Sequence, residues 1–197
     1  MANINAPFGF RQYTGTGSVP TYEQVTLIGG IDYNAAAIYY GDVVSRNASD
    51  GTINIASPGT TTIAGIFVGC KYMSTSQKRT LWSNYWPGSD VAVGNQPLTE
   101  AYIINDPNAQ FIVQSDGTGI TQANIGLNVQ FAVGTPTAAN GLSGAYVTAS
   151  AATTATLPFR IVSLVSFPPG ANGTQSGAYN QVVVAFNNVE TKNTTAV

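Results

Sequence analysis

The sequence predicts an all-β fold, built as a β-barrel or β-sandwich-like domain with little helix. Short runs rich in Val, Ile, Thr, Tyr and Phe recur about every ten residues, a spacing typical of strands in such folds. Gly, Asn, Asp and Pro separate these runs, and the chain holds 21 Gly and 10 Pro among its 197 residues. The alanine clusters lack the apolar stripe of an amphipathic helix.

The expected strands follow one another along the chain with turns between them. In the first part of the chain they are Gln24–Ile28, Ala37–Tyr40, Val43–Arg46, Thr52–Ala56 and Gly65–Tyr72. Further along they are Val91–Val93, Glu100–Ile104, Gln110–Gln114, Asn128–Val133, Ala145–Thr148, Phe159–Ser166 and Gln181–Asn187. Tight turns are expected at Asp50-Gly51 and Asp116-Gly117, because glycine accepts a positive φ. One short helical turn is expected within Thr121–Ile125.

Composition divides the chain into five segments. Residues 1–22 contain Gly and Pro with little periodicity and predict an extended N-terminal arm. Residues 23–72 form a first β half, 73–110 a connecting segment with a Trp/Tyr cluster, 111–188 a second β half and 189–197 a polar tail.

A weak internal repeat suggests that the two β halves are related. The first copy consists of Gly41–Val44, Gly51–Ala56 and Ala64–Cys70, and the second of Gly126–Val129, Gly144–Ala149 and Phe159–Val165. Each copy has the order strand, long hairpin, small-residue loop, strand. The alternative is a coincidence of composition in a β-rich chain.

The composition argues against an enzyme and against a metal or cofactor site. Without histidine the chain has no Ser-His-Asp or Cys-His couple and no imidazole ligand. Its one cysteine, Cys70, lies in an apolar run and is expected to be a small core residue. The aspartates mostly stand beside Gly or Pro, where capping of a turn is their ordinary role. We therefore expect no catalytic residue, no cofactor and no metal.

The charge balance also argues against nucleic acid and membrane partners. Only 8% of the residues are charged, compared with about 25% in average domains. Seven Lys and Arg against nine Asp and Glu cannot neutralise a run of phosphates. No apolar run reaches the ~18 residues of a membrane span, and the first residues lack the pattern of a signal peptide. A weakly charged surface suits dense packing against neighbouring molecules.

The aromatic residues Trp82, Tyr85 and Trp86 have two interpretations. Exposed, they would form a sugar-stacking platform or an anchor in a protein interface, since Trp and Tyr dominate such contacts. Buried, they would hold the two β halves together, with Trp86-Pro87-Gly88 as a rigid turn.

The N-terminal stretch Met1–Arg11 resembles the "APFG-hydrophobic-R" start of structural proteins of tailed bacteriophages, cyanophages among them. The resemblance covers most of residues 1–188 and includes Ile38–Val44, Gly65–Tyr72, Tyr85–Gly88, Asp106–Phe111, Gly126–Asn128, Tyr179–Val184 and Asn187–Asn188. It implies a capsid decoration (cement) protein on the outer capsid surface of the virion, synthesised in the host bacterial cytoplasm. Its partners would be the major capsid protein and further copies of itself, with a trimer favoured over a dimer. The family's usual arginine-proline is Arg11-Gln12 here.

We expect the contacts with capsid or neighbouring subunits to come from the N-terminal arm and the aromatic cluster. The candidate residues are Ala2, Asn3, Asn5, Pro7, Phe8, Phe10, Arg11, Trp82, Tyr85 and Trp86. In this hypothesis Phe8 and Phe10 fill pockets on a partner and Arg11 meets a carboxylate; alternatively, the arm packs on its own barrel. The competing functions are a tail, fibre or other minor virion structural protein, and a carbohydrate-binding module that uses Trp82 and Trp86.

Overall fold

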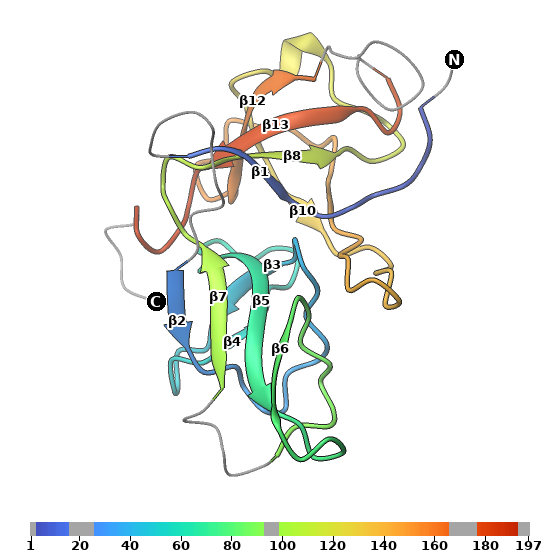
Figure 1. Ribbon diagram of the computed structural model, residues 1–197. Helices are drawn as coiled ribbons and strands as arrows, with labels where there is room; N and C mark the ends of the chain where they lie inside the picture. The colour runs from blue at the N-terminus through green and yellow to red at the C-terminus, as the bar shows by residue number, and fades with distance from the viewer. Residues whose placement is uncertain (1–2, 16–25, 93–98, 166–176, 193–197) are drawn as a thin grey trace.

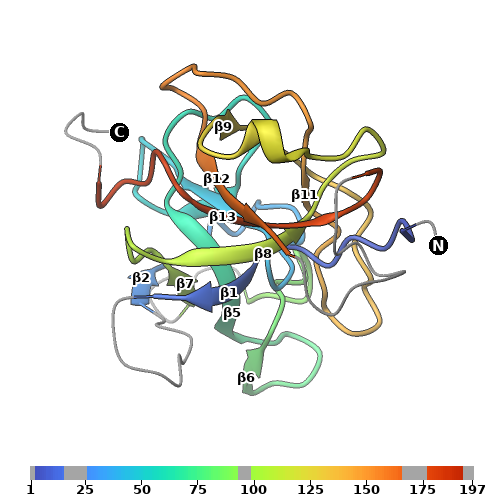
Figure 2. The same cartoon turned by 90° about the horizontal axis from the view of Figure 1, so that it is seen from above.

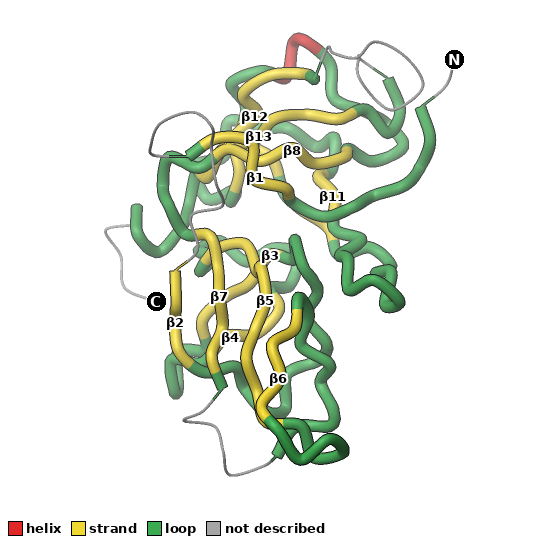
Figure 3. The backbone as a smooth tube through the Cα atoms, viewed as in Figure 1, coloured by secondary structure: helices red, strands yellow, loops and turns green. Residues whose placement is uncertain are grey.

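A computed structural model describes residues 3–15, 26–92, 99–165 and 177–192, and within these ranges the fold is all-β, as predicted. The strands are β1 (Arg11–Thr14), β2 (Thr26–Gly29), β3 (Val43–Arg46), β4 (Ile53–Ile55), β5 (Gly65–Met73), β6 (Thr80–Ser83), β7 (Glu100–Ile104), β8 (Gln110–Gln114), β9 (Asn128–Val129), β10 (Phe131–Ala132), β11 (Tyr146–Val147), β12 (Phe159–Leu164) and β13 (Gln181–Phe186). The expected helical turn is the 3-10 helix η2 (Gln122–Asn124), drawn in red in Figure 3.

The strands form two units, one above the other in Figure 1. The first unit, residues 26–104, holds the sheet β2-β7-β5-β3-β4, with β6 paired to the far end of β5. The second unit, residues 110–186, holds β8-β13-β12-β9, with β1 added beside β8 and the pair β10-β11 completing it. Figure 2 shows β1 running alongside β8. The segment 73–110 thus supplies β6 and β7 to the first sheet instead of only connecting two halves.

The two units share one topology. In the first unit β2 pairs with β7, β7 with β5 and β5 with β3, and in the second unit β8 pairs with β13, β13 with β12 and β12 with β9. The backbone N–H of Gly41 donates to the carbonyl of Phe67 at 2.8 Å, and that of Gly126 donates to Ile161 at 2.9 Å. Both glycines have positive φ, +91° and +87°. The arrangement agrees with the weak repeat in the sequence.

The strand pairing in the structure shifts the alignment of the two repeat copies by one residue. Matching Gly51–Ala56 to Gly144–Ala149 aligns Ile53 with Tyr146. In the structure, however, Ile53 bridges Ile31 after β2, and Val147 makes the equivalent bridge to Ser115 after β8. Ile53 and Val147 are both fully buried, and a one-residue slip in a strand would turn them to the opposite face. In the first unit this bridge joins the two edges of the curled sheet, since β2 and β4 are its edge strands.

Each unit has its own core, but the second core extends beyond its unit. The first core lies inside the first unit and includes Phe67, Trp86 and Ile103. The second core contains the aromatic side chains of β8, β12 and β13, together with residues from the outer face of the first sheet. Successive residues of β5, Ile66 and Phe67, therefore point into different cores, as strand alternation requires. The second unit is thus completed by the back of the first.

Several expected elements differ from the observed ones. Ala37–Tyr40 forms only single bridges at Ile38 and Tyr40, and Asn128–Val133 is broken into β9 and β10. Val91 makes one bridge to Ser74, while residue 93 lies outside the described residues, as do 24, 25 and 166. Strands β1 and β6 were not expected, because neither has an alternating apolar pattern. They are strands because β8 and β5 offer free edges beside them.

The polar tail also begins inside the fold. Val189 is fully buried in the second core, and Glu190 forms an ion pair with Arg46 at 3.1 Å. This apolar anchor fixes the chain at least to Lys192, the last described residue of the tail, whose backbone N–H donates to Val189.

Candidate functional site

The N-terminal segment, residues 3–14, lies against its own chain. The Gln114 side chain, nearly fully buried, accepts the backbone N–H of Ala6 at 3.0 Å and donates to the carbonyl of Ile4 at 2.8 Å. The Asn3 side chain donates to the carbonyl of Ala178. These contacts and strand β1 fix the segment along the second unit, so its described part does not extend away from the molecule as a free arm.

Phe10 is the clearest departure from the sequence hypothesis. Its ring is 1% exposed and stacks on Phe159 with the centroids 4.5 Å apart. It also meets the edge of Phe111. A ring buried in its own core cannot fill a pocket on a partner, so Phe10 is a core residue of the second unit. The alternative of an arm that packs on its own barrel is what the structure has at this position.

The other predicted arm residues differ in how far they are buried. Pro7 and Phe8 are half-buried, Asn5 is exposed, and Ala2 lies outside the described residues. The Arg11 guanidinium lies 4.0 Å from the centre of the Tyr40 ring, a cation–π contact within this chain. Contacts of these residues with a partner stay predictions.

A polar seam joins the N-terminal segment to both units. Gly9, at φ +75°, lets the chain pass so closely that an added Cβ would lie 2.7 Å from the Cβ of Ser143. The Ser143 hydroxyl donates to the Asp42 carboxylate, which also accepts the backbone N–H of Tyr39 at 2.8 Å. Burial raises the pKa of Asp42, and these two hydrogen bonds oppose that rise. Asp42 thus closes the turn that begins at Tyr39, as expected from its Gly neighbour, and is in addition a buried link between the units.

The remaining aspartates cap turns or loops. Asp32, Asp50, Asp106 and Asp116 each accept the backbone N–H two residues ahead, as the sequence predicts. Asp90 differs, because it accepts hydrogen bonds from Ser74, Thr75 and Ser76, which lower its pKa. Within the described ranges no three His, Cys, Asp or Glu side chains gather as they would around a metal ion.

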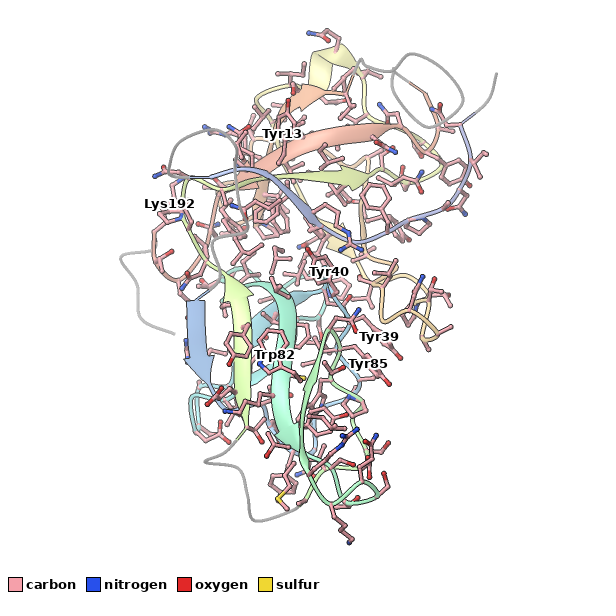
Figure 4. The ribbon with its side chains drawn as sticks, viewed as in Figure 1. Tyr13, Tyr39, Tyr40, Trp82, Tyr85 and Lys192 are labelled. Carbon is pink, nitrogen blue, oxygen red and sulfur yellow. The ribbon has the colours of Figure 1, made fainter. Side chains whose placement is uncertain are left out.

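The aromatic cluster divides into buried and exposed members. Trp86 is fully buried, because backbone hydrogen bonds with Ile38 hold it inside the first unit, and its ring meets Tyr72. The half-buried Tyr85 stacks on Tyr39, with the ring centroids 5.8 Å apart. Trp82 is 66% exposed. Figure 4 places Trp82 over β5 and places Tyr39, Tyr40 and Tyr85 along one edge of the molecule. A platform of two tryptophans therefore does not form.

Trp82 belongs to a small surface cluster, the Trp82 platform, which also contains Lys71, Glu100 and Tyr102. The indole lies 4.8 Å from the Tyr102 ring, centre to centre. Gly69 lies beneath it on β5, and a Cβ there would lie 3.6 Å from the indole. The Tyr102 hydroxyl donates to Glu100 at 2.6 Å, and Lys71 pairs with Glu100 at 3.2 Å. The platform is thus an aromatic surface in which the indole packs against Tyr102 and Gly69, beside an ion pair that carries no net charge.

Ionisation in the platform follows from these bonds. Hydrogen bonds from Tyr102 and Lys71 lower the pKa of Glu100, and the bond to Glu100 raises the pKa of Tyr102. Tyr102 was missed in the sequence hypothesis. The signal that could have found it is the alternation of β7, in which Ala101 and Ile103 are buried while Glu100 and Tyr102 are more exposed.

The single cysteine behaves as predicted from its apolar surroundings. Cys70 is buried in the first core, where its thiol donates to the carbonyl of Tyr85. Burial raises its pKa to about 12, so the thiol stays protonated at neutral pH.

Comparisons with protein-family models, curated proteins and solved structures gave no match. In the described part of the chain, no helix has the length and apolar character needed to cross a membrane.

Proposed function

We propose that the protein is a decoration (cement) protein of a tailed-bacteriophage capsid, which binds the outer surface of the head and bridges major capsid protein subunits. The resemblance that begins at Ala6-Pro7-Phe8-Gly9 supports this function, as does the low fraction of charged residues. Close packing of copies on a shell suits a surface with little like-charge repulsion. In this proposal the protein also assembles with copies of itself, as a trimer rather than a dimer.

The observation that carries the proposal is the exposed Trp82. Tryptophan is enriched among the residues that dominate protein interfaces. The contact with Tyr102 limits the motion of the indole, so less conformational entropy is lost when a partner covers it. The ion pair of Lys71 and Glu100 gives the aromatic surface a polar rim, which is the usual arrangement of an interface.

The test is binding of purified protein to bare capsids. Wild type should bind saturably, at a stoichiometry that matches a repeated shell position, and should raise the temperature at which capsids rupture. Trp82→Ala should weaken binding roughly 30-fold, the effect of about 2 kcal/mol at an interface hot spot. Tyr13→Ala, which changes a 54% exposed ring on β1, is the matched control and should bind like wild type.

Three results would contradict the proposal. Absence of wild-type binding would reject a decoration role, and a few copies at one vertex would favour a tail or fibre protein. Glycan binding that is lost in Trp82→Ala while capsid binding is unchanged would favour a carbohydrate-binding module.

A further inference from the structure

We infer that a pocket of about 440 Å³ in the second unit binds a neutral, polyhydroxylated small ligand of the saccharide class. The pocket lies on different elements from the Trp82 platform, and of the predicted contact residues only Asn5 and Pro7 line it. Its volume falls in the range of small-molecule sites, about 300–1,000 Å³.

The pocket exists only in the folded chain, because four separate segments line it. They are the N-terminal segment (Asn5, Pro7), the end of β8 and its turn (Gln114–Gly117), the hairpin around β11 (Gly134, Thr135, Tyr146) and the residue Tyr179 before β13. In the first unit, Gly30 holds the place of Gln114, as the paired bridges of Ile31 and Ser115 indicate. The pocket is thus built where the N-terminal segment docks, and at the position of Gln114 the first unit has a glycine without a side chain.

The charged and amide groups in the wall are already occupied. The two carboxylate oxygens of Asp116 accept backbone N–H groups of Thr118 and Gly119 on one side and of Ala149 on the other. The Gln114 amide is held by the N-terminal segment and by the carbonyl of Tyr179. Among the lining residues of the described chain there is no Lys or Arg. An anionic ligand would find no cation here, and three of the roughly four lone pairs of the Asp116 carboxylate already accept backbone N–H groups.

What the pocket offers a ligand is uncharged. The hydroxyls of Tyr146 and Tyr179 have no hydrogen-bond partner within the described chain, and each can donate and accept. The two phenol rings supply apolar faces, and the exposed Asn5 adds an amide at the rim. Ring faces together with neutral donors and acceptors match the alternating C–H faces and hydroxyls of a sugar ring.

Tyr179 is held in an unusual backbone conformation at this wall. Its φ is +57°, a left-handed value that is uncommon for a bulky side chain. Its N–H donates to the carbonyl of Asp116 at 2.9 Å, and its carbonyl accepts from Gln114 at 3.0 Å. The phenol consequently lies over Gly117, where an added Cβ would be 3.0 Å from its hydroxyl. Strained residues of this kind concentrate at ligand sites.

The experiment uses saturation-transfer NMR and calorimetry on the full chain with glucose, galactose, N-acetylglucosamine and their neutral disaccharides, and calorimetry with sulfate as an anionic probe. At least one should bind with a millimolar or lower dissociation constant. Tyr146→Phe and Tyr179→Phe keep the rings and remove only the hydroxyls, so each should weaken binding about tenfold without a change in Tm. Tyr13→Phe, the matched exposed control, should bind like wild type.

The inference is overturned if no saccharide of the panel binds wild type, or if binding is unaffected by both pocket variants. Binding lost in Trp82→Ala but kept in the pocket variants would place the sugar on the Trp82 platform instead. Binding of sulfate in preference to the sugars would reject the neutral ligand class. None of these measurements involves capsids, so their failure is distinct from failure of the proposed decoration function.

Discussion

The two units have the same strand order but differ in how each completes its core. The first unit encloses its own apolar side chains, whereas the second takes Phe10 from the N-terminal segment and Val43, Ile66 and Ile104 from the first unit. Their insertions differ too, since β6 with Trp82 lies between β5 and β7, and no described strand occupies the equivalent stretch between β12 and β13. The two units thus share their strand order, whereas the residues that complete each core and the inserted segments differ between them.

Among the substitutions that test this difference, Phe10→Ala is expected to have the largest effect on stability. Removing a fully buried phenylalanine costs about 4 kcal/mol of unfolding free energy, and here the loss falls on the second core. Chemical denaturation should measure the loss, and hydrogen exchange should show greater deprotection in β8, β12 and β13 than in β3 and β5. Tyr13→Ala on the same segment should change stability by less than about 0.5 kcal/mol. Equal deprotection in both units would mean that they do not differ in this way.

The next test compares Gly41 and Gly126, which occupy equivalent positions in the two units. Both have positive φ, so alanine at either position should cost about 1–2 kcal/mol in backbone conformation. At Gly126 an added Cβ meets nothing within 4 Å, but at Gly41 it would lie 3.0 Å from the backbone N of Phe10. Gly41→Ala should therefore cost about 3 kcal/mol or more, because the N-terminal segment must shift as well.

Urea unfolding of both variants measures this difference directly. Equal losses for the two alanine variants in the full chain would show that the close approach of Gly41 to Phe10 is unimportant.

The smallest effect is expected at the polar seam, for Ser143→Ala. The change leaves the buried Asp42 with one hydrogen bond fewer, which should cost about 2 kcal/mol at pH 7. The pKa of Asp42 in the fold already lies above its ordinary value of 3.8, so ionisation lowers stability as the pH rises through the folded pKa. Without Ser143 that pKa rises further, and the penalty should be larger at pH 7 than below pH 4.

The unfolding free energies of wild type and Ser143→Ala, measured from pH 3 to pH 7, provide the test. The pKa values of Glu100, Asp50 and Asp90 are lowered in the fold, so these groups add stability as the pH rises, opposite to Asp42. Because both proteins share these three groups, their contributions cancel in the difference between the two unfolding free energies. In the Asp42→Asn background the penalty for Ser143→Ala should lose its pH dependence. A penalty that is the same at all pH values in wild type would contradict this account.

Much of the fold could be predicted because its strands carry their own patterns. Val43–Arg46, Glu100–Ile104 and Gln110–Gln114 have the predicted bounds, since the first two runs are followed directly by Asn and the third by Ser115 and the Asp116-Gly117 turn. β1 and β6 could not be predicted, because their pairing depends on edges supplied by β8 and β5 far along the chain.

The candidate site was less accessible to sequence reasoning. Trp82 and Trp86 are four residues apart, yet one is exposed and the other is buried by its bridge to Ile38. Aromatic residues in a loop-rich segment indicate that their rings pack against something. They do not indicate whether that partner is the protein's own core or another molecule. The pocket could not be predicted either, because Tyr179 reaches Asp116 from more than 60 residues along the chain, and Asn5 joins them only through the docking of the N-terminal segment.

The position of Phe10 has a consequence for synthesis of the chain. A ribosome makes residues 3–14 before the first unit, but their partners Phe111, Phe159 and Gln114 appear only after the whole first unit has emerged. The first unit has a self-contained core and can form while translation continues. The N-terminal segment must wait for β8 and β12, so its docking is a late event in maturation. Until then an aromatic segment stays exposed on each nascent chain, open to capture by a chaperone or by the second unit of a neighbouring copy.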